Sequence, residues 1–169
     1  MKSIKIIPEK ERVLKVDLNA PIIPGKSLAG IELGENISRY LWELNTDHYF
    51  NFGEKVKINA YAPMFIAYTI ESFGLEIVVY VPEGEIVSLS VRSPYIGKWN
   101  GKVGIGMNTK ELKEYLPDLR VSEGRLVSPE ISGIKFSYPS FIDDLDSYNI
   151  YDFPDFILEE ITIFNTIFY

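Results

Sequence analysis

Apolar and polar residues alternate along most of the chain, a pattern typical of short strands that bury one face. Residues 75–81 (LEIVVYV) are apolar almost throughout, and after a turn at 82–85 the alternating residues 86–92 follow. We expect these two runs to form a hairpin, with 75–81 as a central strand buried on both faces. Further strands are predicted at 31–33, 55–60 and 64–70, and an N-terminal hairpin at 4–18.

Two short helices are predicted between the strands. Ile37, Tyr40, Leu41 and Leu44 have the spacing of one apolar helical face, with Asn36 before them as an N-cap, which predicts a helix over 37–45. A second helix is predicted over 109–115, after the cap residue Asn108, and it must end before Pro117 because proline breaks a helix.

The order of these elements repeats. The shift that aligns Gly34 with Gly106 also aligns Asn36 with Asn108, and 157–164 then corresponds to 85–92. An alternating strand at 101–108 is expected to match the one before the first helix. The sequence therefore predicts an α+β protein, one compact unit over 1–169. It contains two related lobes, at about 22–92 and 101–169, each a β-sheet with one short helix.

The charge of the chain is concentrated behind Lys135. The chain carries 24 acidic and 17 basic residues, a net charge of −7, but the range 1–135 contains 17 of each. The range 136–169 holds seven acids, no base and ten aromatic side chains. Most of these acids lie in 139–155, where the second lobe has a long insertion in place of the tight turn at 82–85. Long loops of this kind are commonly functional.

Composition excludes several classes of protein. The chain has no cysteine, which rules out disulfides and thiolate metal sites. No segment has the apolar length of a membrane span or of a signal peptide, so we expect a cytoplasmic protein that does not contact membranes. The acidic pI of about 4.8 argues against direct binding of nucleic acid.

No motif for catalysis or for a cofactor is present. His48 is the single histidine, and no Gly-x-Ser-x-Gly segment exists to present a serine to it. The glycines around 30–34 and 101–106 do not form a phosphate-binding pattern. Asp143, Asp144 and Asp146 lack the glycine of a calcium loop. We therefore expect no catalytic residue, no cofactor and no metal, and a protein that is not an enzyme.

The acidic, aromatic segment is the predicted site of partner binding. Aromatic side chains supply contact area, and carboxylates steer a basic partner and orient it. Such a surface can cover the cationic groove of a nuclease by imitating the spacing of phosphates. The predicted contact residues are Asp143, Asp144, Asp146, Tyr148, Tyr151, Asp152, Phe153 and Asp155.

Residues 22–34 (IIPGKSLAGIELG) resemble the openings of small immunity proteins of bacterial polymorphic-toxin and contact-dependent growth inhibition systems. The repeated module also resembles tandem-repeat inhibitors of the β-lactamase-inhibitor-like class, in architecture only, and departs from them in lacking cysteines and a signal peptide. The first resemblance implies a cytosolic, non-enzymatic protein that neutralises one toxin domain, often a nuclease. Its matching residues belong to the scaffold, so no family binding site transfers to this chain.

These observations favour an immunity-type inhibitor of a basic toxin domain, and two alternatives remain open. The first is an assembly module that binds another subunit, or itself, through exposed β edges. The apolar residues 161–169 would supply a terminal strand for such pairing. The second is a carboxylate-dependent hydrolase, which would require an activity abolished by substitution of a single acid.

Overall fold

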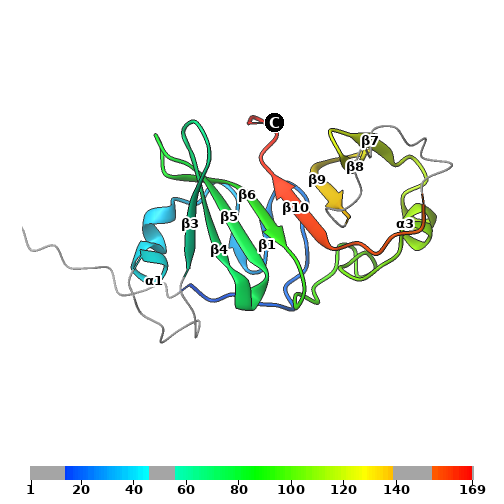
Figure 1. Cartoon of the computed structure of the whole chain (residues 1–169), viewed down its shortest axis with the longest axis horizontal. Coiled ribbons are helices and arrows are strands. Elements are labelled where there is room, and N and C mark those ends of the chain that lie inside the picture. The colour runs from blue at the N-terminus through cyan, green and yellow to red at the C-terminus, as the bar shows by residue number, and fades with distance from the viewer. Residues whose placement is uncertain (1–13, 46–55, 139–153, 169) are drawn as a thin grey trace, which may run out of the picture.

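The computed structural model describes residues 14–45, 56–138 and 154–168 of the chain. Strands dominate this part, and together with short helices they make an α+β protein (Figure 1). A two-stranded antiparallel sheet pairs β1 (Ser27–Leu28) with β2 (Ile31–Glu32). The large sheet has eight strands, all antiparallel, in the order β3-β4-β5-β6-β10-β9-β8-β7.

The first four strands of the large sheet form a meander of consecutive hairpins. They are β3 (Lys57–Ala62), β4 (Phe65–Ile70), β5 (Leu75–Tyr80) and β6 (Glu85–Val91). A 3-10 turn, η2 (Glu71–Phe73), joins β4 to β5. The hairpin predicted at 75–92 is confirmed as β5 and β6. Both faces of β5 are buried at its centre, since Ile77 and Val78 point to opposite sides and neither is exposed by more than 2%.

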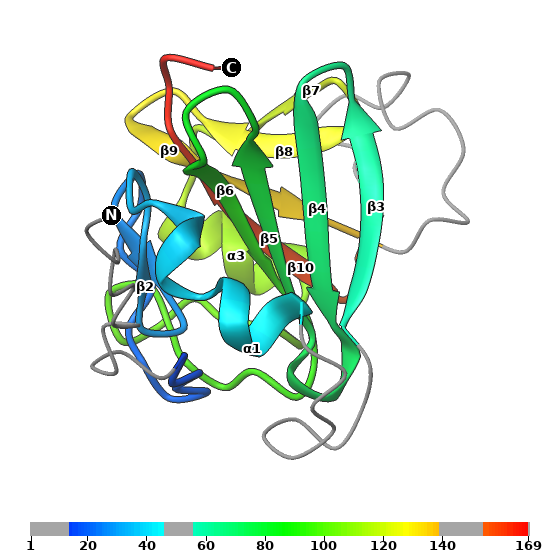
Figure 2. The same cartoon turned by 90° about the vertical axis from the view of Figure 1, so that its left-hand side faces the viewer.

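The other half of the large sheet consists of β7 (Arg120–Ser122), β8 (Arg125–Ser128), β9 (Ile131–Ser137) and β10 (Glu160–Phe164). Here β10 pairs with both β6 and β9. The two halves of the sheet therefore join through β6 and β10, which cross the middle of the molecule (Figures 1 and 2).

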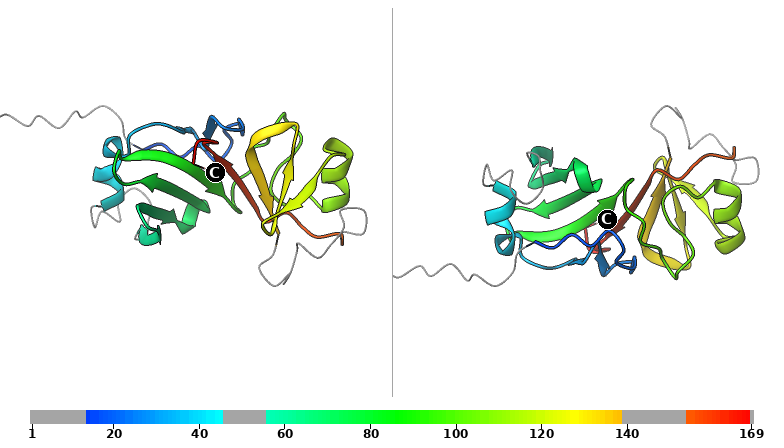
Figure 3. Two further views of the ribbon diagram at one scale, coloured as in Figure 1. Left: turned by 90° about the horizontal axis from the view of Figure 1, so that it is seen from above. Right: turned by 90° about the horizontal axis from the view of Figure 1, so that it is seen from below.

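One face of the sheet carries the main core. Leu28 and Ile31 of the small sheet pack with Leu75, Ile77 and Leu89 of the large sheet. Figure 3 shows α1 at one end of the molecule and α3 with β7–β9 at the other. On the opposite face of the sheet a smaller apolar cluster is centred on Ala67, Val78 and Val87.

Each predicted helix is present but short. The first consists of a 3-10 turn, η1 (Ile37–Arg39), and the α-helix α1 (Leu41–Asn45), so the continuous helix predicted over 37–45 is interrupted at Tyr40. The second, α3 (Thr109–Tyr115), is confirmed at its predicted bounds. Asn36 and Asn108 are N-caps as predicted, because their side chains accept hydrogen bonds from backbone N–H groups of the first turn.

Three backbone hydrogen bonds occur in two copies, related by the shift that aligns Gly34 with Gly106. Gly34 N donates to Ile86 O, and Gly106 N donates to Leu158 O. Ile86 N donates to Glu35 O as Leu158 N donates to Met107 O, and Ile37 N donates to Gly84 O as Thr109 N donates to Phe156 O. Gly34 and Gly106 both have a positive φ, of 82° and 87°, which residues with side chains rarely adopt.

Three predictions of strands need correction. Residues 101–108 form turns with an isolated bridge between Trp99 and Val103, because glycines at 101, 104 and 106 favour turns over extended pairing. The strand predicted over 161–169 is present only as β10, which ends at Phe164, and it is not at an edge because it lies between β6 and β9. In the predicted N-terminal hairpin, residues 4–13 lie outside the described residues, and 14–18 alternate in burial without being a strand.

Candidate functional site

The predicted partner-binding segment lies almost entirely outside the part of the chain that the structure describes. This holds for Asp143, Asp144, Asp146, Tyr148, Tyr151, Asp152 and Phe153, and also for His48 elsewhere in the chain. The residues on either side of the segment are described. The rings of Tyr138 and Phe156 lie 6.3 Å apart, so the two ends of the segment meet beside each other at the end of β9.

Asp155 is the one predicted contact residue whose position is described. Its Oδ1 atom accepts a hydrogen bond of 3.1 Å from the backbone N of Lys110, in the first turn of α3. Phe156 O and Asn108 Oδ1 accept the neighbouring N–H groups of Thr109 and Glu111. All three donors of the first turn are thus satisfied, two of them by residues of 155–156. Asp155 therefore has a structural role, and its side chain is exposed.

The two other acids described near the C-terminus differ from each other. Glu159 is exposed. Glu160 is partly buried, and its Oε2 atom accepts a hydrogen bond of 2.7 Å from Arg92 Nε. Arg92 lies directly after β6, so this ion pair links the two strands at the centre of the sheet. Glu160 is a less accessible contact for a partner than Glu159.

Sequence analysis missed a second candidate site, a polar pocket on the sheet face opposite the main core. The pocket has a volume of about 240 Å³. Ser90 and Thr162 lie opposite each other on β6 and β10 at its floor, with exposed fractions of 6% and 3%. Their hydroxyl oxygens are 2.8 Å apart and share a hydrogen bond. A third hydroxyl, that of Ser88, donates to Ile163 O at 3.2 Å.

Strand register explains why these side chains meet. Across the sheet, Glu76 of β5 lies opposite Ser90, Ser90 opposite Thr162, and Thr162 opposite Lys135 of β9. Residues in register across antiparallel strands point to the same face. Glu76 and Ser90 belong to one hairpin, but Lys135 and Thr162 come from strands much further along the chain, so no local motif indicates the complete set. The alternation of polar with apolar residues in 86–92 and 160–164 was the available signal.

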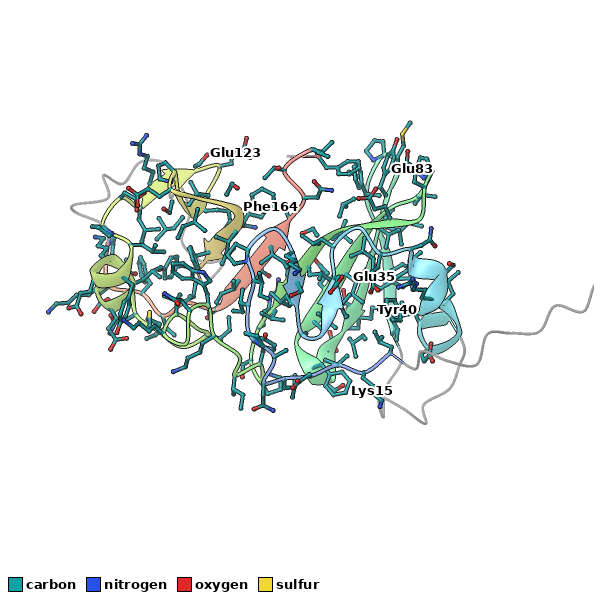
Figure 4. The ribbon with its side chains drawn as sticks, turned by 180° about the vertical axis from the view of Figure 1, so that it is seen from behind. Lys15, Glu35, Tyr40, Glu83, Glu123 and Phe164 are labelled. Carbon is teal, nitrogen blue, oxygen red and sulfur yellow. The ribbon has the colours of Figure 1, made fainter. Side chains whose placement is uncertain are left out.

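Charged side chains surround the hydroxyls. The pocket is lined by three cations, Arg92, Arg125 and Lys135, and by two carboxylates, Glu76 and Glu160. Burial lowers the pKa of Lys135, and the neighbouring charge of Arg125 lowers it further, while Glu160 and Glu123 act in the opposite direction. The Nζ atom of Lys135 also lies 5.4 Å from the centre of the Phe164 ring. Figure 4 labels Phe164 on β10 and Glu123 in the turn between β7 and β8.

Ser137 adds a buried hydroxyl to the same face of β9. It lies two positions beyond Lys135, opposite Glu160 of β10, and only 5% of it is exposed. No group among the described residues forms a hydrogen bond with its Oγ atom. Ser137 is not among the residues that line the pocket.

Two further cavities are lined by fewer polar and charged side chains. One, of about 390 Å³, is lined by residues that include Leu14, Gly30, Lys15, Glu35 and Tyr40. Figure 4 labels the last three. Tyr40 donates to Glu35 there, and Arg39 forms an ion pair with the same carboxylate. The other, of about 470 Å³, is mainly apolar and lies between residues 93–96 and 157–159.

Over residues 14–45, 56–138 and 154–168, no three acidic or histidine side chains cluster as ligands of a metal ion would. No helix in these ranges has both the length and the apolar character needed to cross a membrane. No family model, no curated protein and no solved structure matches the chain.

Proposed function

We propose that this chain is a non-enzymatic, cytoplasmic inhibitor of the immunity type, which binds and neutralises a cationic protein domain. One observation carries the proposal: every unit of the net charge of −7 lies after Lys135, in a segment that is also rich in aromatic residues. Charge concentrated in this way steers association with a basic partner, and aromatic residues supply the buried contacts that hold it. A nuclease domain is one partner of suitable charge.

The fold supports this proposal by fixing both ends of the segment. Tyr138 and Phe156 pack together, and Asp155 is bound to the start of α3. A loop with closely anchored ends loses less conformational entropy on binding than a free tail. The proposed contacts are Asp143, Asp144, Asp146, Tyr148, Tyr151, Asp152, Phe153 and Asp155.

The test is a pull-down from lysate of the native source with the tagged full chain, eluted with a salt gradient. We expect a basic protein domain to elute, and substitution of Asp143, Asp144 and Asp146 by Asn to abolish its capture. Salt screens charges over roughly 10 Å at 0.1 M, so affinity must fall as salt rises. Inhibition of the recovered domain's activity by the chain, measured in vitro, would then show neutralisation.

The matched control replaces three exposed acids elsewhere, Glu83, Glu114 and Glu130, by Gln. It removes the same charge from other places, so it must retain the partner. If both triple variants lose the partner equally, net charge alone is responsible and the segment is not the contact surface. Capture that is indifferent to salt would contradict the proposal as a whole.

Assembly through a β edge is a second candidate function. The proposed edge is β3 rather than residues 161–169, because β10 is an inner strand of the sheet. In the large sheet, β3 is an outer strand, and residues 57–60 are exposed, including Ile58 at 49%. An exposed edge with an apolar residue can pair with another chain. Sedimentation velocity would detect a self-assembled species, and an Ile58→Lys change should dissociate it. A monomer at all concentrations excludes self-assembly.

We also propose that the chain consists of two copies of one module. This is supported by the three duplicated hydrogen bonds, all at the shift that aligns Gly34 with Gly106, and by the caps Asn36 and Asn108. The same shift relates Ser90 to Thr162, which face each other across β6 and β10. An approximate two-fold axis between these residues would relate β3–β6 to β7–β10.

A further inference from the structure

The mainly apolar cavity of about 470 Å³ lies between residues 93–96 and 157–159, and the second of these walls follows residues 139–155 in the chain. A large apolar side chain on each wall is accessible to solvent: Ile96 is 65% exposed and Ile157 is 52% exposed. Gly106 leaves further room in the lining, because a Cβ atom there would meet no atom within 4 Å other than those of its chain neighbours. Exposed apolar surface of this kind is typical of a contact for another protein.

Exposure alternates along residues 155–159. Asp155, Ile157 and Glu159 are exposed. The residues between them, Phe156 and Leu158, are half-buried and buried. This is the pattern of an extended chain, in which successive side chains point to opposite sides. The outward side of the segment therefore carries one apolar residue between two carboxylates.

The inner side of the same segment is held by contacts to other parts of the chain. The ring of Phe156 packs against that of Tyr138, at 6.3 Å between centres. Leu158 is fully buried, and its N–H donates to Met107 O at 2.7 Å. Ile157 lies between these two anchored residues, so its backbone is placed before any partner binds. A contact placed in advance loses little conformational entropy on binding.

The two carboxylates of the outward side remain accessible. Glu159 is the charged residue among the described residues that line the cavity, and it is exposed. Asp155 accepts a hydrogen bond from Lys110 N through Oδ1, and its side chain is also exposed. Neither carboxylate forms a salt bridge with a residue in the described ranges. Carboxylates beside an apolar contact favour a partner with basic residues around an apolar one, and they oppose an acidic partner.

We propose that this cavity receives one apolar side chain of the cationic partner, presented between basic residues that contact Asp155 and Glu159. This inference rests on the proposed inhibitor function, and it names the part of the partner that the described surface fits. An apolar side chain seated in a pocket and surrounded by polar contacts is a common source of binding energy at protein interfaces. The volume of about 470 Å³ is sufficient for the side chain of a leucine or a phenylalanine.

A synthetic peptide tests the cavity without the natural partner. The probe is the blocked peptide KKFKK, titrated into the full chain while NMR follows the isoleucine methyl groups. We expect saturating shifts for Ile96, Ile105 and Ile157, with a Kd on the order of 1 mM, and no shift for the distant Ile167. The matched peptides KKSKK and EEFEE should bind at least about tenfold more weakly. The first lacks the apolar side chain, and the second carries the same charge as the carboxylates.

Substitutions separate the cavity from general effects of charge and apolar surface. Ile157→Ser should raise the Kd of KKFKK at least about tenfold, because it removes one apolar wall. Ile167→Ser is the matched control, since it removes another exposed isoleucine and should leave the Kd unchanged. Glu159→Gln should weaken binding about threefold, as expected for one exposed ion pair. Ile96→Ser, on the opposite wall, is the second test if Ile157→Ser disturbs the fold.

Three outcomes overturn the proposal. The first is equal binding of KKFKK and KKSKK, or no binding of either, which would mean that the cavity takes no apolar side chain. The second is equal binding of KKFKK and EEFEE, which would exclude a preference for a basic partner. The third is a dimer in sedimentation velocity that Ile157→Ser dissociates, which would make the occupant a second copy of the chain.

The peptide experiment and the pull-down fail independently. No natural partner is present in the titration, so a cavity that does not bind KKFKK leaves the inhibitor proposal, which rests on the charge after Lys135, in place. Conversely, a pull-down that recovers no basic domain contradicts the inhibitor proposal even where KKFKK binds. If both hold, Ile157→Ser should also weaken the recovered partner at least about tenfold, and Ile167→Ser should not.

Discussion

At the scale of single residues, burial changes the pKa of polar side chains. Tyr138 follows β9 and is 7% exposed, with its ring against Phe156. Burial raises the pKa of Tyr138 to about 12, with the hydrogen bond to the side chain of Thr109 acting against this and Asp155 adding to it. Nothing in the sequence around Tyr138 distinguishes it from the other tyrosines of the acidic segment.

Ionisation of Tyr138 should lower the stability of the fold at alkaline pH. Its folded pKa of about 12 lies above the ordinary value of 10.0, so the folded state holds the proton more tightly than the unfolded state. The contribution is complete below pH 10 and is lost as pH rises from 10 through 12. We expect the free energy of unfolding to fall by up to about 3 kcal/mol over this range. Urea unfolding at a series of pH values measures the slope.

Tyr138→Phe is the control for this pH dependence. The variant retains the ring but cannot ionise, so its stability should decline less steeply above pH 10. Burial also raises the pKa values of Tyr68 and Tyr95, and these residues should leave a residual slope in the variant. Identical slopes in both proteins would mean that Tyr138 ionises in the folded state as readily as in the unfolded state.

At the scale of elements, patterns between near neighbours in the chain predicted well. The hairpin of β5 and β6, the bounds of α3 and the two asparagine caps all follow from spacing and turn residues in the sequence. The hairpin of β7 and β8 was missed, although Glu123 and Gly124 form its turn with positive φ. Such a turn ending in glycine is itself a hairpin signal.

The start of α3 shows how an element depends on distant residues. Asp155→Ala should lower the free energy of unfolding by about 1 kcal/mol, because it removes the acceptor for Lys110 N and a negative charge at the helix N-terminus. Asp155→Asn keeps an acceptor and should lose less. The midpoint and slope of urea unfolding report both values.

The same pair of variants separates the structural role of Asp155 from its proposed role in binding. If Asp155→Asn keeps the stability and loses the cationic partner, the charge of Asp155 serves binding. If Asp155→Ala unfolds at the same urea concentration as the wild-type chain, the hydrogen bond to α3 contributes nothing measurable, and the interpretation of Asp155 as a cap is wrong.

At the scale of the whole molecule, the last described residues, 165–168, pack against the large sheet without being a strand of it. Asn165 N donates to Val87 O, and the ring of Phe168 lies 6.4 Å from Phe65 and 5.2 Å from Tyr80. This segment therefore covers one end of the sheet face opposite the main core. Removal of 165–169 would expose Phe65 and Tyr80, so such a truncation would change folding as well as any self-association.

Phe168→Ala should reduce the free energy of unfolding by about 1 to 2 kcal/mol, less than for a fully buried phenylalanine because Phe168 is half-buried. Ile167→Ala is the neighbouring control, since Ile167 is 84% exposed and its truncation should change stability little. Urea unfolding of the two variants compares them directly. Equal effects would show that the cluster of Phe65, Tyr80 and Phe168 does not stabilise the sheet.

The sequence by itself determined the local features of this protein: strand periodicity, caps, turns, and the separation of charge behind Lys135. These depend on residues close together in the chain, where backbone sterics and the helical and strand periods act directly. It did not determine that β10 is central, because the pairing of β6 with β10 joins residues that are far apart in the chain.

Only the tertiary structure decided that Ser90, Thr162 and Lys135 share one face, or that Asp155 caps a helix that precedes it by a large part of the chain. Such contacts follow from the strand order and register of the complete sheet, in which a shift of one position would turn each side chain to the opposite face. The physical cause is long-range packing of two sheet halves on a shared core, which no local pattern encodes.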